Sequence, residues 1–247
     1  DKKSTEAGFK YLLFGAATSA IFLYGLSLIY GFAGATRLEA IGGYFVSLNP
    51  VSLGVLLLIV VGLGFKISLV PFHFWAPDTY EGSPSPVAGF LSTASKAAGL
   101  AVLMRLFMLA FPKIVVDWQM LLAILATLSM TLGNLAALGQ TNIKRLLAYS
   151  SIAHAGYALV GVVAANQLGI TGVVYYVIAY ILTNLAAFGV VTAFGKVTGS
   201  DEIRAYDGMS RRSPYLGLAM LVAFLSLSGM PPFGGFVAKV LVFAGAI

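Results

Sequence analysis

Long, almost uncharged apolar stretches are the feature that most restricts how this chain can fold. One of them, VSLGVLLLIVVGLGF, runs for about fifteen residues before the first charge at Lys66. Uncharged apolar stretches of about 18 or more residues are typical of helices that span a bilayer, whereas a barrel would show alternating strands of about ten residues. Only 10% of the residues are charged, against roughly 25% in a soluble domain. We therefore predict an all-α polytopic membrane protein.

The apolar pattern predicts about seven transmembrane helices, two of them broken. They are expected at roughly 7–32, 51–77, 85–111, 119–139, 143–165, 170–195 and 214–247. The second and the seventh contain turn residues in mid-run, LVPFHFWAP and SGMPPFGGF. Because proline removes a backbone donor and clashes with the preceding turn, we expect breaks near 71–77 and 229–235. Such breaks are tolerated in a bilayer only where the freed backbone is covered by protein or faces water.

The two broken spans suggest an internal repeat. They lie five spans apart, an odd number, so they run in opposite directions if they correspond, as in inverted-repeat transporters. Their sequence similarity is slight, and on this pattern alone a repeat and a coincidence are about equally supported. We predict one membrane domain, with the end of a first inverted repeat in 1–112 and most of a second in 113–247. The chain has no signal peptide and stops inside the apolar run VFAGAI, so we expect a piece truncated at both ends.

Positive charge is concentrated on one side of the predicted membrane. The side that holds the N-terminus carries Lys2, Lys3, Lys144, Arg145, Lys196, Arg204, Arg211 and Arg212. The other side carries only Arg37 and Lys113. By the positive-inside rule the first side is cytoplasmic, and the expected location is the bacterial plasma membrane. This asymmetry also explains the net charge of +6, which is no argument for nucleic acid as a partner.

Three lysines stand inside predicted spans, namely Lys66, Lys96 and Lys239. An ionised lysine at the centre of a helix in lipid costs roughly 2.5 to 3.5 kcal/mol, so such residues normally face a bundle interior or water and mark ion paths. The alternative is snorkelling, in which the stem carries the ammonium to the interface. For Lys96 the headgroups lie roughly 15 Å away, beyond the reach of the stem. For the other two lysines snorkelling stays open.

A buried lysine with a movable acidic partner acts as a proton switch, because desolvation favours the neutral amine and a nearby carboxylate favours the ammonium. All nine acids, however, lie in loops or at span edges. The partner would have to come from another part of the protein or from a neighbouring subunit.

Two histidines complete the candidate sites. His154 lies about level with the lysines and either relays protons or packs as a hydrogen-bonded core residue. His73, in the first break, either connects Lys66 to Lys96 or caps freed carbonyls. Without an embedded carboxylate or cysteine beside them, a metal site is not expected. The absence of cysteine excludes a thiolate-held iron–sulfur cluster in this chain, and no dinucleotide or phosphate motif is visible, so we expect no cofactor here.

Three segments together resemble a known family. They are VGLGFKISLVPFHFWAPDTYEGSPSPVAGFLSTASK, NIKRLLAYSSIAHAGY and LSLSGMPPFGGFVAK. They are similar to the antiporter-like membrane subunits of respiratory complex I, the proton-translocating NADH-quinone oxidoreductase, and most closely to subunit N (subunit 2). The resemblance implies a fold of fourteen helices in two inverted five-helix repeats, of which this chain would be helices six to twelve.

The resemblance also implies roles for residues. The lysines of the family's broken helices map onto Lys66 and Lys239, that of the intervening helix onto Lys96, and its histidine onto His154. Protons would be relayed through these groups while NADH, flavin, iron–sulfur clusters and quinone act in other subunits. The expected partners are the bilayer, protons and the other membrane-arm subunits, including neighbouring antiporter-like ones. The family's glutamate partner of Lys66 is missing from this sequence, because Glu6 does not correspond to it.

Two alternatives remain at this point. A subunit of a multisubunit sodium/proton antiporter would share the ancestry and the lysines. A structural scaffold of the membrane arm would hold the lysines permanently neutral or paired.

Overall fold

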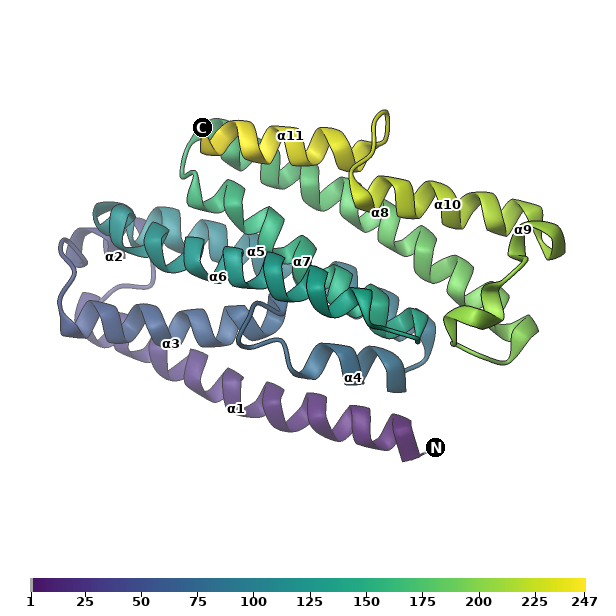
Figure 1. The fold of residues 1–247 in the computed structure, drawn as a ribbon. Coiled ribbons are helices and arrows are strands. Elements are labelled where there is room, and N and C mark those ends of the chain that lie inside the picture. Colours follow the sequence, from purple (N-terminus) through teal and green to yellow (C-terminus); the bar gives the residue numbers. More distant parts are fainter. Residues whose placement is uncertain (1) are drawn as a thin grey trace.

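The protein is a bundle of helices that run nearly parallel or antiparallel along one axis (Figure 1). The structure, a computed structural model, describes residues 2–247, and within that range it has helices and no strand. The elements are α1 (Lys2–Ala33), α2 (Leu38–Tyr44), α3 (Pro50–Ile67), α4 (Trp75–Gly82), α5 (Ser85–Ala110), η1 (Pro112–Ile114), α6 (Val115–Leu138), α7 (Ile143–Val163), α8 (Gln167–Thr198), η2 (Ile203–Tyr206), α9 (Met209–Arg212), α10 (Pro214–Ser228) and α11 (Gly234–Ala246).

The predicted spans are confirmed as helices. In the described part of the chain, six helical segments are long and apolar enough to cross a membrane: α1, α3, α5, η1 with α6, α7 and α8. The seventh predicted span consists of the shorter apolar helices α10 and α11. The short helices α2 and α9 were not predicted, because they lie in the connections between spans and carry no long apolar pattern.

Both predicted breaks are present, and the first halves of the two broken spans, α3 and α10, end in the same way. Ser68 after α3 and Gly229 after α10 are left-handed, with φ of 59° and 83°. In both caps the N–H one residue further on donates to a carbonyl five residues back, from Leu69 to Gly64 and from Met230 to Leu225. This is the Schellman pattern that satisfies the last carbonyls of a helix.

The first break lies slightly earlier in the chain than we predicted. It occupies residues 68–74, whereas we expected 71–77. Pro77 belongs to the first turn of α4, where the missing proline N–H has no partner to lose. The second break, at 229–233, falls within the expected segment.

Asparagine side chains start three of the helices. The side chain of Asn49 accepts a hydrogen bond from Ser52 N–H at the start of α3, and that of Asn166 accepts one from Gly169 N–H at the start of α8. The side chain of Asn142 accepts from the N–H groups of Lys144 and Arg145 at the start of α7. Each satisfies backbone donors that have no partner inside the helix. These caps fix where α3, α7 and α8 begin.

Small residues bring α6 and α7 into close contact, which positions the site on α7. A β-carbon on Gly133 would lie 2.6 Å from Ala153 N, and one on Gly156 would lie 2.8 Å from Ala126 O. Such close approach of backbones is a common way for helices to associate in lipid, where no hydrophobic drive pulls them together.

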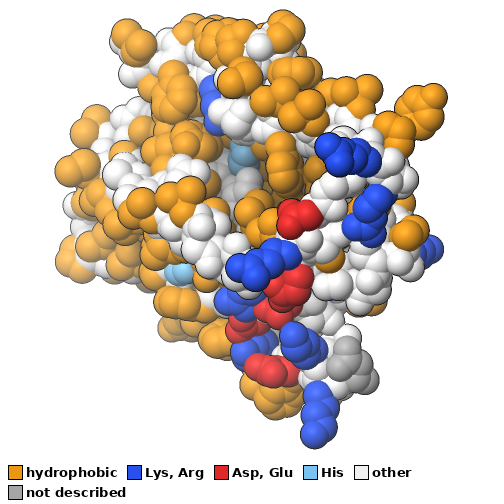
Figure 2. Space-filling view, turned by 45° about the vertical axis from the view of Figure 1, so that its right-hand side comes forward, with side chains coloured by type: hydrophobic (Ala, Val, Ile, Leu, Met, Phe, Trp, Pro, Cys, Tyr) orange, Lys and Arg blue, Asp and Glu red, His pale blue; other side chains and the backbone are white. Residues whose placement is uncertain are grey.

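Charged residues gather at one end of the bundle, while much of the remaining visible surface is hydrophobic (Figure 2). At this end Lys3 pairs with Glu81 at 3.2 Å, and Lys144 pairs with Asp201 at 2.8 Å. Four segments therefore meet on one side of the bundle, as the span count predicts. They are the N-terminal segment, the connection after α4, the connection before α7 and the connection after α8.

Candidate functional site

Lys96 lies in the middle of the uninterrupted helix α5 and is buried inside the bundle. Its side chain is 3% exposed, so it does not snorkel along the outside of the chain. The ammonium donates hydrogen bonds to Ser151 on α7, at 2.9 Å to the carbonyl oxygen and 2.8 Å to Oγ. Among the described residues no carboxylate pairs with it.

Lys66 lies in the last turn of α3, directly before the first break. Its side chain is exposed at the surface of this chain, and within residues 2–247 its ammonium makes no hydrogen bond or ion pair. The ammonium lies 5.9 Å from the ring centre of Tyr11 on α1. The helix of Lys66 is close to that of Lys96, because a β-carbon on Gly99 would lie 3.5 Å from the Lys66 β-carbon. Gly99 itself lies about one helical turn from Lys96 along α5, so the two lysines belong to packed neighbouring helices.

His154 is buried one turn along α7 from Ser151, with an exposed fraction of 8%. Its Nδ1 lies 2.6 Å from the Tyr176 hydroxyl on α8, and its ring lies 5.1 Å from that of Tyr180. A ring nitrogen with one hydroxyl partner can accept or donate a proton according to its tautomer.

Lys239, on α11, reaches back across the second break to the end of α10. Its ammonium donates to the carbonyl oxygens of Leu227 at 3.2 Å and Ser228 at 2.8 Å. It also lies 4.7 Å from the ring centre of Tyr157 on α7, one turn from His154. A cavity of about 620 Å³ opens beside Tyr157 and His154. Both residues line it, together with Lys239.

His73 is buried in the first break, and its ring is tilted by 32° against that of Phe74, with 4.6 Å between the ring centroids. Its Nδ1 is buried without a hydrogen-bond partner among residues 2–247, and no hydrogen bond or ion pair joins the ring to either lysine. Both interpretations open from the sequence, capping of freed carbonyls and connection of Lys66 to Lys96, stay predictions.

The contacts arrange the predicted residues in one order through the bundle. Lys66 on α3 adjoins the helix of Lys96, which contacts Ser151 on α7. His154 follows on the same helix, and the ring of Tyr157 leads to Lys239.

Several polar residues of this arrangement were not among the site residues predicted from the sequence. They are Tyr80, Ser151, Tyr157, Tyr176 and Tyr180. One signal was available in the sequence, since Tyr176 and Tyr180 are four residues apart and share a helix face in a largely apolar span.

The charged end of the bundle holds a network centred on Arg145. Its guanidinium lies 2.7 Å from Asp78 and 2.9 Å from Glu81, and Asp78 also pairs with Lys10 at 2.6 Å. Partial burial raises the pKa of each carboxyl group, but the hydrogen bonds from these cations outweigh it and leave the pKa values of Asp78 and Glu81 lower than usual. This network ties α1, α4 and α7 together.

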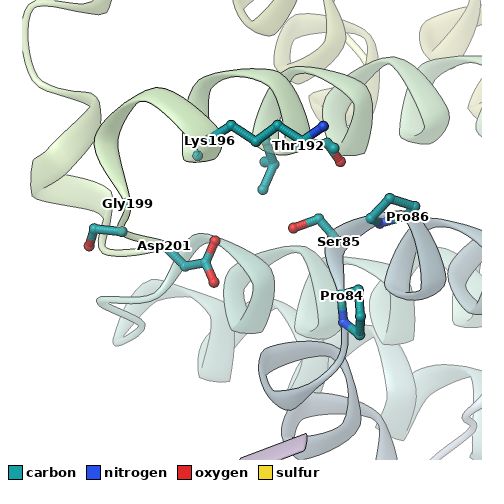
Figure 3. Close-up of a pocket in the computed structure, with 10 residues that line it drawn as sticks. Pro84, Ser85, Pro86, Thr192, Lys196, Gly199 and Asp201 are labelled. Carbon is teal, nitrogen blue, oxygen red and sulfur yellow. The ribbon is translucent and has the colours of Figure 1, made fainter. Parts of the chain in front are cut away.

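A separate cavity of about 390 Å³ lies at the same end and contains none of the predicted site residues. It is lined by residues from the start of α5 and the end of α8, including Ser85, Thr192 and Lys196 (Figure 3). Asp201 on its wall is already paired with Lys144. The cavity is therefore distinct from the lysine arrangement.

The fold and the site define an integral, multi-pass membrane protein with broken helices and a lysine buried inside the bundle. The chain belongs to the NADH:quinone oxidoreductase/Mrp antiporter transmembrane family, whose sequence profile matches residues 1–247.

Individual relatives agree with this assignment. The chain is 51% identical over 249 residues to NADH-quinone oxidoreductase subunit N from Moorella thermoacetica, covering 100% of this chain and 52% of that protein. It resembles a chain of respiratory complex I from Thermus thermophilus, with a TM-score of 0.85, 44% identity and coverage of 100% and 53%. It also resembles a chain of the Mrp complex from Dietzia sp., with a TM-score of 0.91, 25% identity and coverage of 98% and 45%. The chain spans about half the length of the curated relatives it matches.

Proposed function

We propose that this chain is part of a proton-translocating membrane subunit of NADH:quinone oxidoreductase, respiratory complex I. The observation that carries the proposal is the buried Lys96, which contacts Ser151 and has no carboxylate partner among the described residues. A desolvated amine changes its charge when its surroundings change, so it can take up and release a proton during turnover.

The relay proposed here runs through Lys66, Lys96, His154 and Lys239, in the order of their contacts. Lys66 stands at the first break and Lys239 at the second, which agrees with the presence of sites at broken helices in inverted-repeat transporters. The matching caps after α3 and α10 favour a division into two inverted repeats, one ending in 1–112 and the other in 113–247. His73 is at most a connector near the first break.

The driving reaction belongs to other subunits in this proposal. NADH, flavin, iron–sulfur clusters and quinone would act there, and the partners of this chain would be membrane-arm subunits that include neighbouring antiporter-like ones. The basic end of the bundle would face the cytoplasm, because positively charged connections favour that side, and the membrane would be the bacterial plasma membrane.

A sodium/proton antiporter subunit is the second candidate. The likeness to the Mrp complex, with a TM-score of 0.91, favours it, although the 25% identity is lower than the 44% found with complex I. The fold is common to both classes, so fold alone does not separate them.

Redox-driven proton uptake in membrane vesicles separates the candidates. Vesicles that carry the whole complex, given NADH and no sodium gradient, are expected to acidify, and Lys96→Met is expected to abolish this while the complex still assembles. Proton movement that needs a sodium gradient but no electron donor would favour the antiporter instead. Normal pumping by the Lys96→Met complex would contradict a proton relay through Lys96 in either candidate function.

A further inference from the structure

The Ser151 hydroxyl is the point at which four elements meet around Lys96. It lies on α7 with its residue 1% exposed, and it accepts a hydrogen bond from Lys96 on α5. It also donates to the Ala148 carbonyl oxygen of its own helix at 2.9 Å. The side chains of Tyr80 on α4 and Tyr180 on α8 interact with it as well.

The two tyrosine hydroxyls are left without partners. Both oxygens are buried, and neither makes a hydrogen bond of good geometry to any of residues 2–247. Buried hydroxyl groups normally find a partner. Each of the two is therefore a donor whose hydrogen bond to a free acceptor would stabilise the protein. Ser151 Oγ is one such acceptor, and the side chains of both tyrosines interact with it.

A count of donors and acceptors at Ser151 shows that Lys96, Tyr80 and Tyr180 compete for the lone pairs of its hydroxyl oxygen. A serine hydroxyl has one donor and two acceptor lone pairs. The donor is engaged by Ala148 and one lone pair by Lys96, so a single lone pair remains for Tyr80 and Tyr180. Only when Lys96 withdraws can both tyrosines bond to Ser151.

We propose that Ser151 is the positioning residue of Lys96: it holds the ammonium against α7, and the competing hydroxyls of Tyr80 and Tyr180 release it. Because Tyr80 belongs to the second half of the first broken span, movement of α4 changes the strength of this competition and so the hold on Lys96. The inference rests on the proposed function and adds to it the residue that sets the position of the central lysine.

The surroundings of Lys96 contain few other charges. Lys66 approaches from α3, His154 lies one turn along α7, and Lys239 follows beyond it on α11. In the described chain no acidic group lies within ion-pair distance of the Lys96 ammonium. Its charge therefore responds chiefly to the Ser151 oxygens and to the neighbouring cations.

The test uses the complete complex in membrane vesicles, with proton uptake measured as a function of pH. Pumping that needs a protonated lysine is lost on the alkaline side as the ammonium deprotonates. Ser151→Ala removes an acceptor that stabilises the ammonium, so pumping should fall at least about fivefold and the alkaline limb should move to lower pH. Ser151→Thr keeps the hydroxyl and should retain most of the activity.

The paired variant Tyr80→Phe/Tyr180→Phe removes the competing donors and keeps the rings. Lys96 then holds Ser151 without competition, so pumping should also fall, but the alkaline limb should move to higher pH. Thr93→Val is the matched control, because Thr93 is a buried hydroxyl one turn from Lys96 that bonds only to carbonyls of its own helix. It should leave the rate and the profile unchanged.

If Ser151 positions Lys96, the alkaline limbs of Ser151→Ala and of the double tyrosine variant move in opposite directions. A purely structural role of these residues would lower pumping without moving the limb. The inference is overturned if Ser151→Ala pumps normally, or if it and the double tyrosine variant leave the alkaline limb in place in an assembled complex. Its failure is separate from that of the proposed function, which fails if Lys96→Met pumps normally or if proton movement needs a sodium gradient and no electron donor.

Discussion

The Lys239 ammonium lies 2.8 Å from the carbonyl oxygen of Ser228, although the two residues belong to opposite halves of a broken helix. The last carbonyls of α10 have no intrahelical partner and carry the negative end of the helix dipole. The lysine from α11 supplies both a donor and a positive charge. The charge of Lys239 is therefore coupled to the geometry of the break itself.

Gly229→Ala should test this coupling. Gly229 is left-handed, and a β-carbon there would lie 2.8 Å from Lys239 Cδ. The substitution should lower stability by roughly 1 to 2 kcal/mol through the backbone alone and should also displace the lysine. We expect proton pumping to fall severalfold in vesicles.

Gly199→Ala is the control for that experiment. Gly199 is also left-handed, with φ of 66°, but among the described residues nothing lies within 4 Å of its added β-carbon. It should show a comparable loss of thermal stability with pumping retained. Equal losses of pumping in both variants would mean that Lys239 is not involved.

Lys96→Met should remove the titratable group while it keeps the length of the buried side chain. Because the site is closely packed and methionine is apolar, the complex should assemble, and pumping should fall at least about tenfold, equivalent to about 1.4 kcal/mol of activation free energy. Lys96→Arg should fail as well, since a guanidinium does not deprotonate in proteins. Wild-type pumping by Lys96→Arg would show that the residue is a fixed charge.

Tyr176→Phe should leave the His154 ring without its 2.6 Å hydroxyl partner. A buried polar group that loses its partner costs roughly 1 to 3 kcal/mol, so we expect a lower melting temperature together with reduced pumping. Tyr175→Phe, at an exposed neighbouring position, should change neither quantity. The pair of variants is compared by thermal unfolding and by proton uptake; identical behaviour would rule out the His154–Tyr176 contact as a functional one.

The network at the charged end should make stability depend on pH in the acidic range. The folded-state pKa values of Asp78 and Glu81 lie below their usual values of 3.8 and 4.5, because hydrogen bonds from Lys10, Arg145 and Lys3 outweigh the effect of burial. A lowered pKa means that the stabilisation is fully present above the usual value and is lost as pH falls through the folded-state value.

Thermal unfolding of the complex between pH 6 and pH 3 measures this effect, with the range chosen to bracket the usual carboxyl pKa values of about 4. Asp78→Asn should lower stability at pH 6 and flatten the dependence below it. A slope that is unchanged in Asp78→Asn would show that other carboxyl groups are responsible.

The sequence by itself determined the membrane class, the spans and the positions of the breaks to within a few residues. Those features depend on local chemistry: apolar length matches bilayer thickness, and proline removes a backbone donor wherever it stands. The position of Lys96 in the middle of an unbroken helix also followed, because an uninterrupted apolar run places it there and a helix rises by a constant amount per residue.

Only the tertiary structure decided which groups surround those lysines. Ser151 is 55 residues from Lys96 in sequence, and its role depends on how closely α5 and α7 pack. The tyrosines around Ser151 come from α4 and α8. Apolar periodicity does not distinguish a tyrosine that faces lipid from a tyrosine whose hydroxyl lies beside a buried serine. Helix packing sets these contacts, and it depends on the small residues and side-chain shapes of all the helices together.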